Sequence, residues 1–160
     1  MQSPKTNGNG IIRVRLDRWH EYTVYTVFSL LTASGILWIL FHYFVSKQGT
    51  FGRIPHPLEK LWLEIHGAVA MLTLLLLGTL LLVHMWRAWV SKINRWSGST
   101  LFILNLFLIV TGYCLYYLGN EHVRAQISLL HWVTGLLLPL FLIVHVLSAR
   151  KYAGNNGQRY

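Results

Sequence analysis

The sequence predicts an all-α membrane protein, a four-helix bundle whose chain crosses a bilayer four times. The 160-residue chain is 54% hydrophobic and only 12% charged, which is far from the composition of soluble domains. Four apolar stretches are long enough to cross a hydrocarbon core of about 30 Å. Two of these stretches contain two histidines each, and a titratable side chain at membrane depth is costly unless something compensates it.

Short polar or basic segments separate the four predicted spans. The spans are Tyr22–Val45, Leu61–Trp89, Leu101–Leu118 and Ile127–Ala149. The third is close to the minimum length for a crossing. We divide the chain into a flexible basic arm over 1–18, a membrane domain over 19–150 and a polar tail over 151–160. The first 18 residues are polar and basic, so we expect no cleaved signal peptide.

Positive charge is distributed unevenly between the two sides of the predicted bundle. Ten of the 14 Lys and Arg residues lie in the N-terminal arm, in the Arg87–Ser99 connection or around the C-terminal tail. The other four lie near the turn-rich Ser46–Lys60 loop and the Gly119–Ala125 turn. This positive-inside asymmetry predicts a multi-pass protein of the bacterial inner membrane with both termini in the cytoplasm. Nucleic-acid binding is excluded, because the polar segments are too short to build a basic face.

The four intramembrane histidines form one pair on each of two helices. His66 and His84 are 18 residues apart, which at about 100° per residue returns to the same helix face. His131 and His145 are 14 residues apart, about 40° short of the same face. Because spans two and four run in the same direction, the depths of the histidines match pairwise.

Matched depths predict haem ligation. A low-spin haem takes two axial imidazole nitrogens, and helices of a bundle supply them from opposite sides. We expect His66 and His131 to hold an outer haem, and His84 and His145 an inner one. Small residues would make room for the porphyrin: Gly67, Ala68, Gly78, Thr134 and Gly135. Interfacial cations would meet its carboxylates: Arg53, Lys60 and Arg124 outside, and Arg87, Arg95 and Arg150 inside.

Other interpretations of the histidines compete with haem ligation. Intramembrane histidines also hydrogen-bond between helices without binding a cofactor. Metal transport is disfavoured, since Glu64 is the one acid well inside a span and Cys114 is the one cysteine. The single cysteine also excludes a disulfide framework, and no Cys-x-x-Cys-His motif is present to attach haem covalently.

The remaining histidines are assigned to interfaces and loops. His20 precedes the first span, His42 lies near that span's outer end, and His56 and His122 lie in outer loops. We expect them to be solvated, with His42 or His122 able to reach a haem carboxylate.

The two halves of the chain resemble a repeated two-helix unit. Ser34-Gly35 in the first span corresponds to Thr111-Gly112 in the third. His66 and His131 then open equivalent helices, and each of these helices ends on a Val-His pair. If the repeat is real, spans two and four each contribute one histidine to each cofactor.

These residues resemble the four-helix di-haem cytochrome b superfamily, which includes membrane subunits of bacterial formate dehydrogenases and nickel–iron hydrogenases. The resemblance covers roughly Arg13 to Arg150 and is most specific at His131-x13-His145. It implies a fourth ligand from a histidine opening the first helix, which here is His20. Phase, depth and the repeat favour His84 instead, so the fourth ligand is open between the two.

The resemblance implies an electron-transfer subunit of a respiratory oxidoreductase complex. Its partners would be membrane quinone and a periplasmic or peripheral redox subunit, such as a c-type cytochrome or an iron–sulfur protein. Two alternatives are a stand-alone quinone-linked superoxide or ferric reductase and a non-redox membrane scaffold or small transporter. The chain carries no flavin or nucleotide motif, so any partner enzyme activity would reside in another subunit.

Overall fold

The computed structural model of the chain describes residues 18–50, 52–85 and 95–157. Its long helices are α1 (Arg18–Leu40), α2 (Pro57–Leu80), α4 (Arg95–Tyr117) and α5 (Glu121–Gly157). All four are long and apolar enough to cross a membrane. The predicted all-α, four-helix architecture is therefore confirmed, and it is that of a multi-pass membrane protein.

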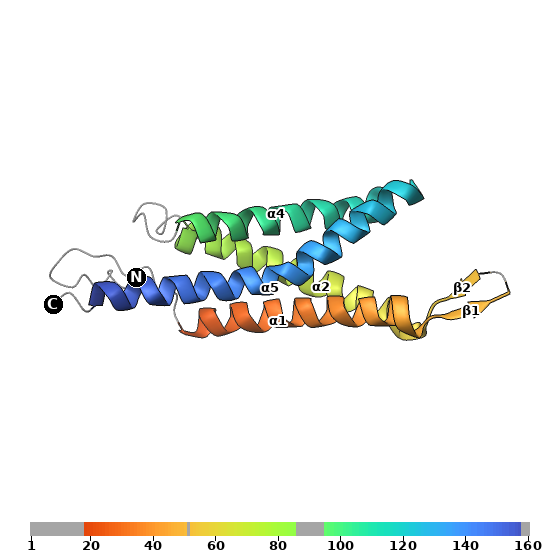
Figure 1. Cartoon of the computed structure of the whole chain (residues 1–160), viewed down its shortest axis with the longest axis horizontal. Coiled ribbons are helices and arrows are strands. Elements are labelled where there is room, and N and C mark those ends of the chain that lie inside the picture. The colour runs from red at the N-terminus through yellow and green to blue at the C-terminus, as the bar shows by residue number, and fades with distance from the viewer. Residues whose placement is uncertain (1–17, 51, 86–94, 158–160) are drawn as a thin grey trace.

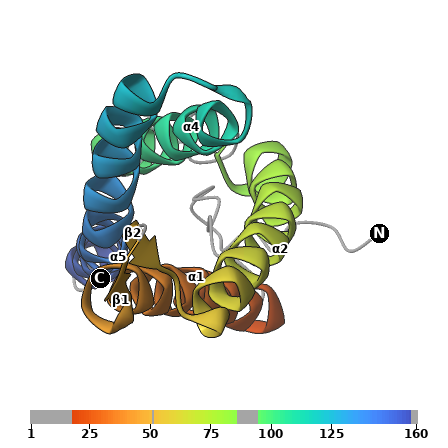
Figure 2. The same cartoon turned by 90° about the vertical axis from the view of Figure 1, so that its right-hand side faces the viewer.

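The four helices lie lengthwise side by side (Figure 1). Viewed from one end, they follow one another around the bundle in the order α1, α2, α4, α5 (Figure 2). The closest neighbours are α1 with α2 and α4 with α5, while α5 also contacts α1. Helices α2 and α5, which carry the four intramembrane histidines, therefore lie diagonally across the bundle from each other.

The two ends of the bundle differ. One end carries the hairpin of β1 (Lys47–Gly49) and β2 (Gly52–Ile54), together with the turn between α4 and α5 (Figure 1). We call it the hairpin end, and we call the end where α1 begins and α5 finishes the opposite end. The strands pair antiparallel with Lys47 across from Ile54. Gly52 has a φ of 115°, a left-handed conformation that glycine adopts without steric cost.

The helices are longer than their apolar cores. Helix α2 begins at Pro57, inside the predicted Ser46–Lys60 loop, because the ring nitrogen of His56 accepts from the Leu58 backbone at 3.2 Å and proline is preorganised for a first helical turn. Helix α5 begins at Glu121 because Asn120 Oδ1 caps the backbone of Val123. Helix α4 has 23 residues, which is ample for a crossing.

Two short π-helices extend α1 and α2 at their C-terminal ends. They are η1 (Phe41–Val45) after α1 and η2 (Leu81–Met85) after α2. A π-turn advances by a smaller angle per residue than an α-turn. The prediction that His66 and His84 share one face assumed α-helical rotation throughout, and that assumption fails at η2.

A small apolar layer joins the four helices between the two levels of histidines. Its buried members are Val24 and Phe28 of α1 and Leu138 of α5, and leucines of α2 and α4 pack against them. Among the described residues no side chain falls below 2% exposure. Apart from this layer, several of the best-buried side chains are polar: Ser34, Glu59, Thr73, Asn105 and Thr111.

Candidate functional site

His66 is held by the first helix through its Nδ1 atom. That atom lies 3.1 Å from the Leu31 carbonyl oxygen and 3.1 Å from the Ser34 hydroxyl. Ser34 donates its own proton to the same carbonyl at 3.0 Å. Because a carbonyl only accepts, Nδ1 of His66 carries the hydrogen, and the unprotonated nitrogen of the ring is Nε2.

His131 is held in the same way by α4. Its Nδ1 atom lies 2.9 Å from the Thr111 hydroxyl oxygen. The Thr111 hydroxyl also lies 2.8 Å from the Phe107 carbonyl, and when its proton is donated there, its oxygen accepts from the histidine. In that arrangement His131, like His66, carries its hydrogen on Nδ1 and keeps the lone pair on Nε2. The equivalent contacts in the two halves support the repeat that the sequence indicates.

A glycine next to each hydroxyl residue lets the histidine ring approach the helix. A Cβ on Gly35 would lie 3.2 Å from Cε1 of His66, and one on Gly112 would lie 3.4 Å from Cε1 of His131. Each Ser/Thr-Gly pair thus provides an acceptor and a flat surface for one imidazole. We call these pairs hydroxyl–glycine cradles.

The two cradled histidines face each other across the bundle. The ring centres of His66 and His131 are 6.3 Å apart, and the ring planes are inclined by 84°. Both side chains are half-buried. The structure thus brings these two predicted ligands together at the hairpin end.

The opposite end gathers the remaining predicted ligands. His145 Nδ1 lies 2.9 Å from the hydroxyl of Ser97, and a Cβ on Gly98 would lie 3.7 Å from its Cε1. Ser97-Gly98 is therefore a third cradle.

His84 is the second member of the group at the opposite end. It lies within electrostatic range of both His145 and His20. Nε2 of His20 lies 3.4 Å from the hydroxyl of Thr79. Both candidates for the fourth ligand thus lie at this end, and the structure leaves the choice between them open.

The predicted cations take varied positions. Arg53 of β2 bonds to Glu59 and to the His42 carbonyl, and Lys60 pairs with Glu64 at 3.7 Å. Arg124 is exposed in the first turn of α5, and Arg150 lies beside Tyr25 of α1. Arg95 is the first residue of α4. Arg87 lies outside the described residues.

The three glycines predicted to make room for a porphyrin are not the ones that touch the histidine rings. A Cβ added at Gly67 or Gly78 would meet nothing within 4 Å, and one at Gly135 would meet only Leu108 at 3.9 Å. The contacts to the imidazoles come from glycines on the neighbouring helices α1 and α4.

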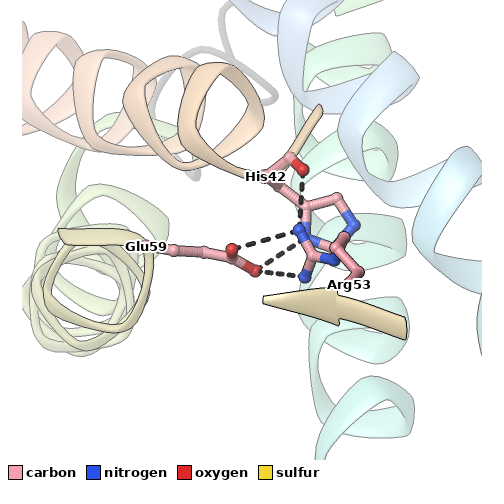
Figure 3. Close-up of polar contacts among 3 residues, drawn as sticks. All are labelled: His42, Arg53 and Glu59. Atoms are coloured by element: carbon pink, nitrogen blue, oxygen red, sulfur yellow. Dashed lines mark hydrogen bonds and ion pairs between the residues drawn. The ribbon is translucent and has the colours of Figure 1, made fainter. Parts of the chain in front are cut away.

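A second polar cluster lies at the hairpin end and was missed in the sequence. Nδ1 of His42 lies 2.7 Å from Oε1 of Glu59, and Arg53 bonds to both Glu59 oxygens at 2.8 and 3.1 Å (Figure 3). The Glu59 side chain is only 10% exposed. His42 is therefore hydrogen-bonded to Glu59 rather than free in solvent, contrary to the expectation. The sequence conceals the cluster because Glu59 falls in a segment assigned to a loop.

Two tryptophans at the hairpin end have buried indole nitrogens. No hydrogen-bond acceptor among the described residues reaches Nε1 of Trp62 or Nε1 of Trp132. Leaving such a donor unpaired costs about 1–3 kcal/mol. Trp62 precedes His66 by one turn of α2, and Trp132 follows His131 directly in α5.

No protein-family model, curated protein or solved structure matches the chain. Its function is accordingly inferred from its own residues.

Proposed function

We propose that the chain is a di-haem b-type membrane cytochrome that transfers electrons between a redox partner subunit and the quinone pool. One observation carries the proposal. His66 and His131 reach toward each other from diagonally opposed helices, and both are hydrogen-bonded through Nδ1 so that Nε2 keeps its lone pair. This is the tautomer that an axial haem ligand requires.

The spacing of the two imidazoles suits one iron between them. A metal–imidazole bond is about 2.0 Å long, and a ring nitrogen lies about 1.1 Å from the centre of its ring. Two such ligands on one iron therefore place their ring centres about 6 Å apart, and His66 and His131 are at 6.3 Å. Bound haem would supply a reversible one-electron centre.

The hydroxyl–glycine cradles favour ligation over simple helix–helix adhesion. One hydrogen bond from Nδ1 to the neighbouring helix is enough for adhesion, and adhesion alone gives no role to Nε2 and no reason for the two rings to face each other. Here Nδ1 of His66 bonds back to α1 and Nδ1 of His131 to α4, the neighbours that each helix already contacts. The bonds orient the rings, which is what a second shell of hydrogen bonds does for metal ligands.

The half-buried opposite end supports a second haem, with His145 and either His84 or His20 as ligands. Cations near each end would meet the haem carboxylates: Arg124 and Lys60 at one end, Arg95 and Arg150 at the other. Trp132 adds a buried N–H donor beside His131. We infer bis-histidine haem b at both levels, as in the cytochrome b superfamily that the sequence resembles.

We propose that the hairpin end faces the periplasm of a bacterial inner membrane. The excess of cations around the chain termini and the 86–94 connection supports this sidedness. A periplasmic c-type cytochrome or iron–sulfur subunit would then approach the His66–His131 level.

Cysteine labelling tests the sidedness. Thr50→Cys in the hairpin should react in intact cells with an impermeant reagent, and Trp96→Cys, 90% exposed at the opposite end, should not, both in a Cys114→Ser background. The reverse pattern would reject this topology.

The decisive test of the haem proposal is optical. A reduced-minus-oxidised spectrum of the purified chain should show a b-type α-band, and electron paramagnetic resonance should show low-spin ferric iron. A folded helical protein without haem would instead favour the scaffold alternative. Co-purification with a redox partner would separate a respiratory subunit from a stand-alone superoxide or ferric reductase.

A further inference from the structure

A continuous polar stripe runs along α2 from the hairpin end to the first proposed haem ligand. Glu59, Trp62 and His66 follow one another at spacings of three and four residues, which places them on one helix face. Glu59 is buried, Nε1 of Trp62 is buried without an acceptor, and His66 faces His131. About 10 Å of helix separates the two ends of the stripe.

His42 is arranged as a proton acceptor beside this stripe. Its Nδ1 atom is 2.7 Å from Glu59, and two hydrogen bonds from Arg53 keep that carboxylate in place. A carboxylate that accepts from Nδ1 leaves Nε2 as the proton-accepting nitrogen, as in carboxylate–histidine pairs of general-base sites. The indole of Trp38 stacks on the ring at 4.6 Å.

We propose that His42 and Trp62 form a binding site for the head group of a quinol. This inference rests on the proposed function and adds the place where its membrane-soluble substrate binds. A quinol ring carries two oxygens across from each other: one would accept from Nε1 of Trp62 and the other would donate to Nε2 of His42. The aromatic surround and the position at the edge of the membrane suit a flat, lipid-soluble ring.

The chemistry balances with the proposed haems as oxidant. Conversion of one quinol to a quinone releases two electrons and two protons. When bound, two ferric haems would accept one electron each. The hydroxyl beside His42 would give its proton to Nε2 and from there to the water at the hairpin end, and the hydroxyl beside Trp62 would release its proton to the same water. Glu59 stays ionised throughout and stabilises the imidazolium that forms.

The competing explanation is that the cluster has a purely structural role. Arg53 also donates to the His42 carbonyl and so attaches the hairpin to the end of the first helix. His42→Asn separates the two roles. The Asn amide nitrogen takes the place of Nδ1 and can still donate to Glu59, while the proton acceptor Nε2 is lost. Trp62→Phe similarly removes one N–H and keeps most of the ring.

The test uses the haem-loaded protein in detergent with decylubiquinone and decylubiquinol as probes. Calorimetric titration should show that Trp62→Phe weakens decylubiquinone binding about tenfold, the loss of one buried hydrogen bond. His42→Asn should slow haem reduction by decylubiquinol about 100-fold. The matched control Trp96→Phe, exposed at the opposite end, should leave binding and reduction unchanged.

Haem content separates failure of this proposal from failure of the proposed function. Both variants should keep the haem stoichiometry and optical spectrum of the unmodified protein. If they keep both and also bind and oxidise the probe normally, the quinol site is rejected while the cytochrome stands. If Trp62→Phe loses haem, its N–H serves the porphyrin carboxylates and the quinol site is likewise rejected. If the chain binds no haem at all, the proposed cytochrome function itself is rejected.

Discussion

The two ends of the bundle hold their histidines differently. At the hairpin end, two cradled histidines face each other, and both are hydrogen-bonded to the neighbouring helix through Nδ1. At the opposite end, one cradled histidine, His145, lies with two others, His84 and His20. The contacts at the hairpin end thus follow the two-helix repeat, whereas those at the opposite end do not.

The repeat explains where the departure lies. Ser97 precedes Thr111 by 14 residues, and His20 precedes Ser34 by 14 residues. His20 therefore occupies in α1 the place that the cradle serine Ser97 occupies in α4. The second helix pair keeps two cradles, whereas the first has exchanged one cradle for a histidine. On the proposed function, His20 either serves as a ligand or takes the place of the serine as a partner of His84.

The largest expected effect is loss of one haem from the symmetric end. His66→Ala and His131→Ala should each lower the haem content from two per chain to one, because one iron loses an axial ligand. The signals of the remaining haem should persist. Haem extraction and the reduced spectrum measure this, and the exposed His122→Ala serves as control. Loss of both haems, or of neither, would contradict two independent sites.

The next largest effect decides which histidine at the opposite end is the fourth ligand. We expect His84→Ala to lose the second haem and His20→Ala to retain it with a shifted midpoint potential, since His84 shares its helix with His66. Redox titration of both variants decides the matter. Retention of the haem in His84→Ala together with its loss in His20→Ala would reassign the fourth ligand.

Much of this arrangement was predictable from the sequence. Hydropathy and length predicted the four spans, and the common direction of the second and fourth spans predicted that His66 and His131 lie at one level, as their 6.3 Å separation shows. Ser97-Gly98 could have been found from its 14-residue distance to Thr111, which equals the distance between His131 and His145. The tautomers were not predictable, since they depend on which carbonyls lie within 3 Å or so of a ring nitrogen.

The position of His84 and the His42 cluster depend on local geometry that residue spacing in the sequence does not predict. The π-helix η2 alters the rotation before His84, so counting at 100° per residue misplaces it. The cluster of His42, Arg53 and Glu59 joins a π-turn, a strand and a helix start. Only the folded hairpin brings those three side chains together.

A smaller effect distinguishes the two cradles at the hairpin end. Thr111→Val keeps the shape and removes the hydroxyl that accepts from His131, so haem affinity should fall about 10- to 100-fold. Ser34→Ala should cost less, because the Leu31 carbonyl still accepts from His66 at 3.1 Å. Transfer of haem to apomyoglobin measures both affinities. Equal losses would show that the Leu31 carbonyl does not hold the His66 proton.

The smallest effect is a graded change in stability across the three cradle glycines. Alanine gains about 1 kcal/mol over glycine inside a helix, and overpacking costs about 1–3 kcal/mol. Gly35→Ala, at 3.2 Å from the ring, should therefore destabilise the protein, and Gly98→Ala, at 3.7 Å, should stabilise it, with Gly112→Ala between them. Thermal unfolding in detergent gives the order, and a reversed order would contradict ring-on-glycine packing.

Haem content of the intact, folded chain tests the central claim most directly. Protein expressed with an adequate haem supply and purified in mild detergent should yield two non-covalent b-type haems per chain in the pyridine haemochrome assay. Its ferric form should give low-spin bis-imidazole signals in electron paramagnetic resonance. A monodisperse, helical preparation that contains no haem and takes up none from added haemin would contradict the account.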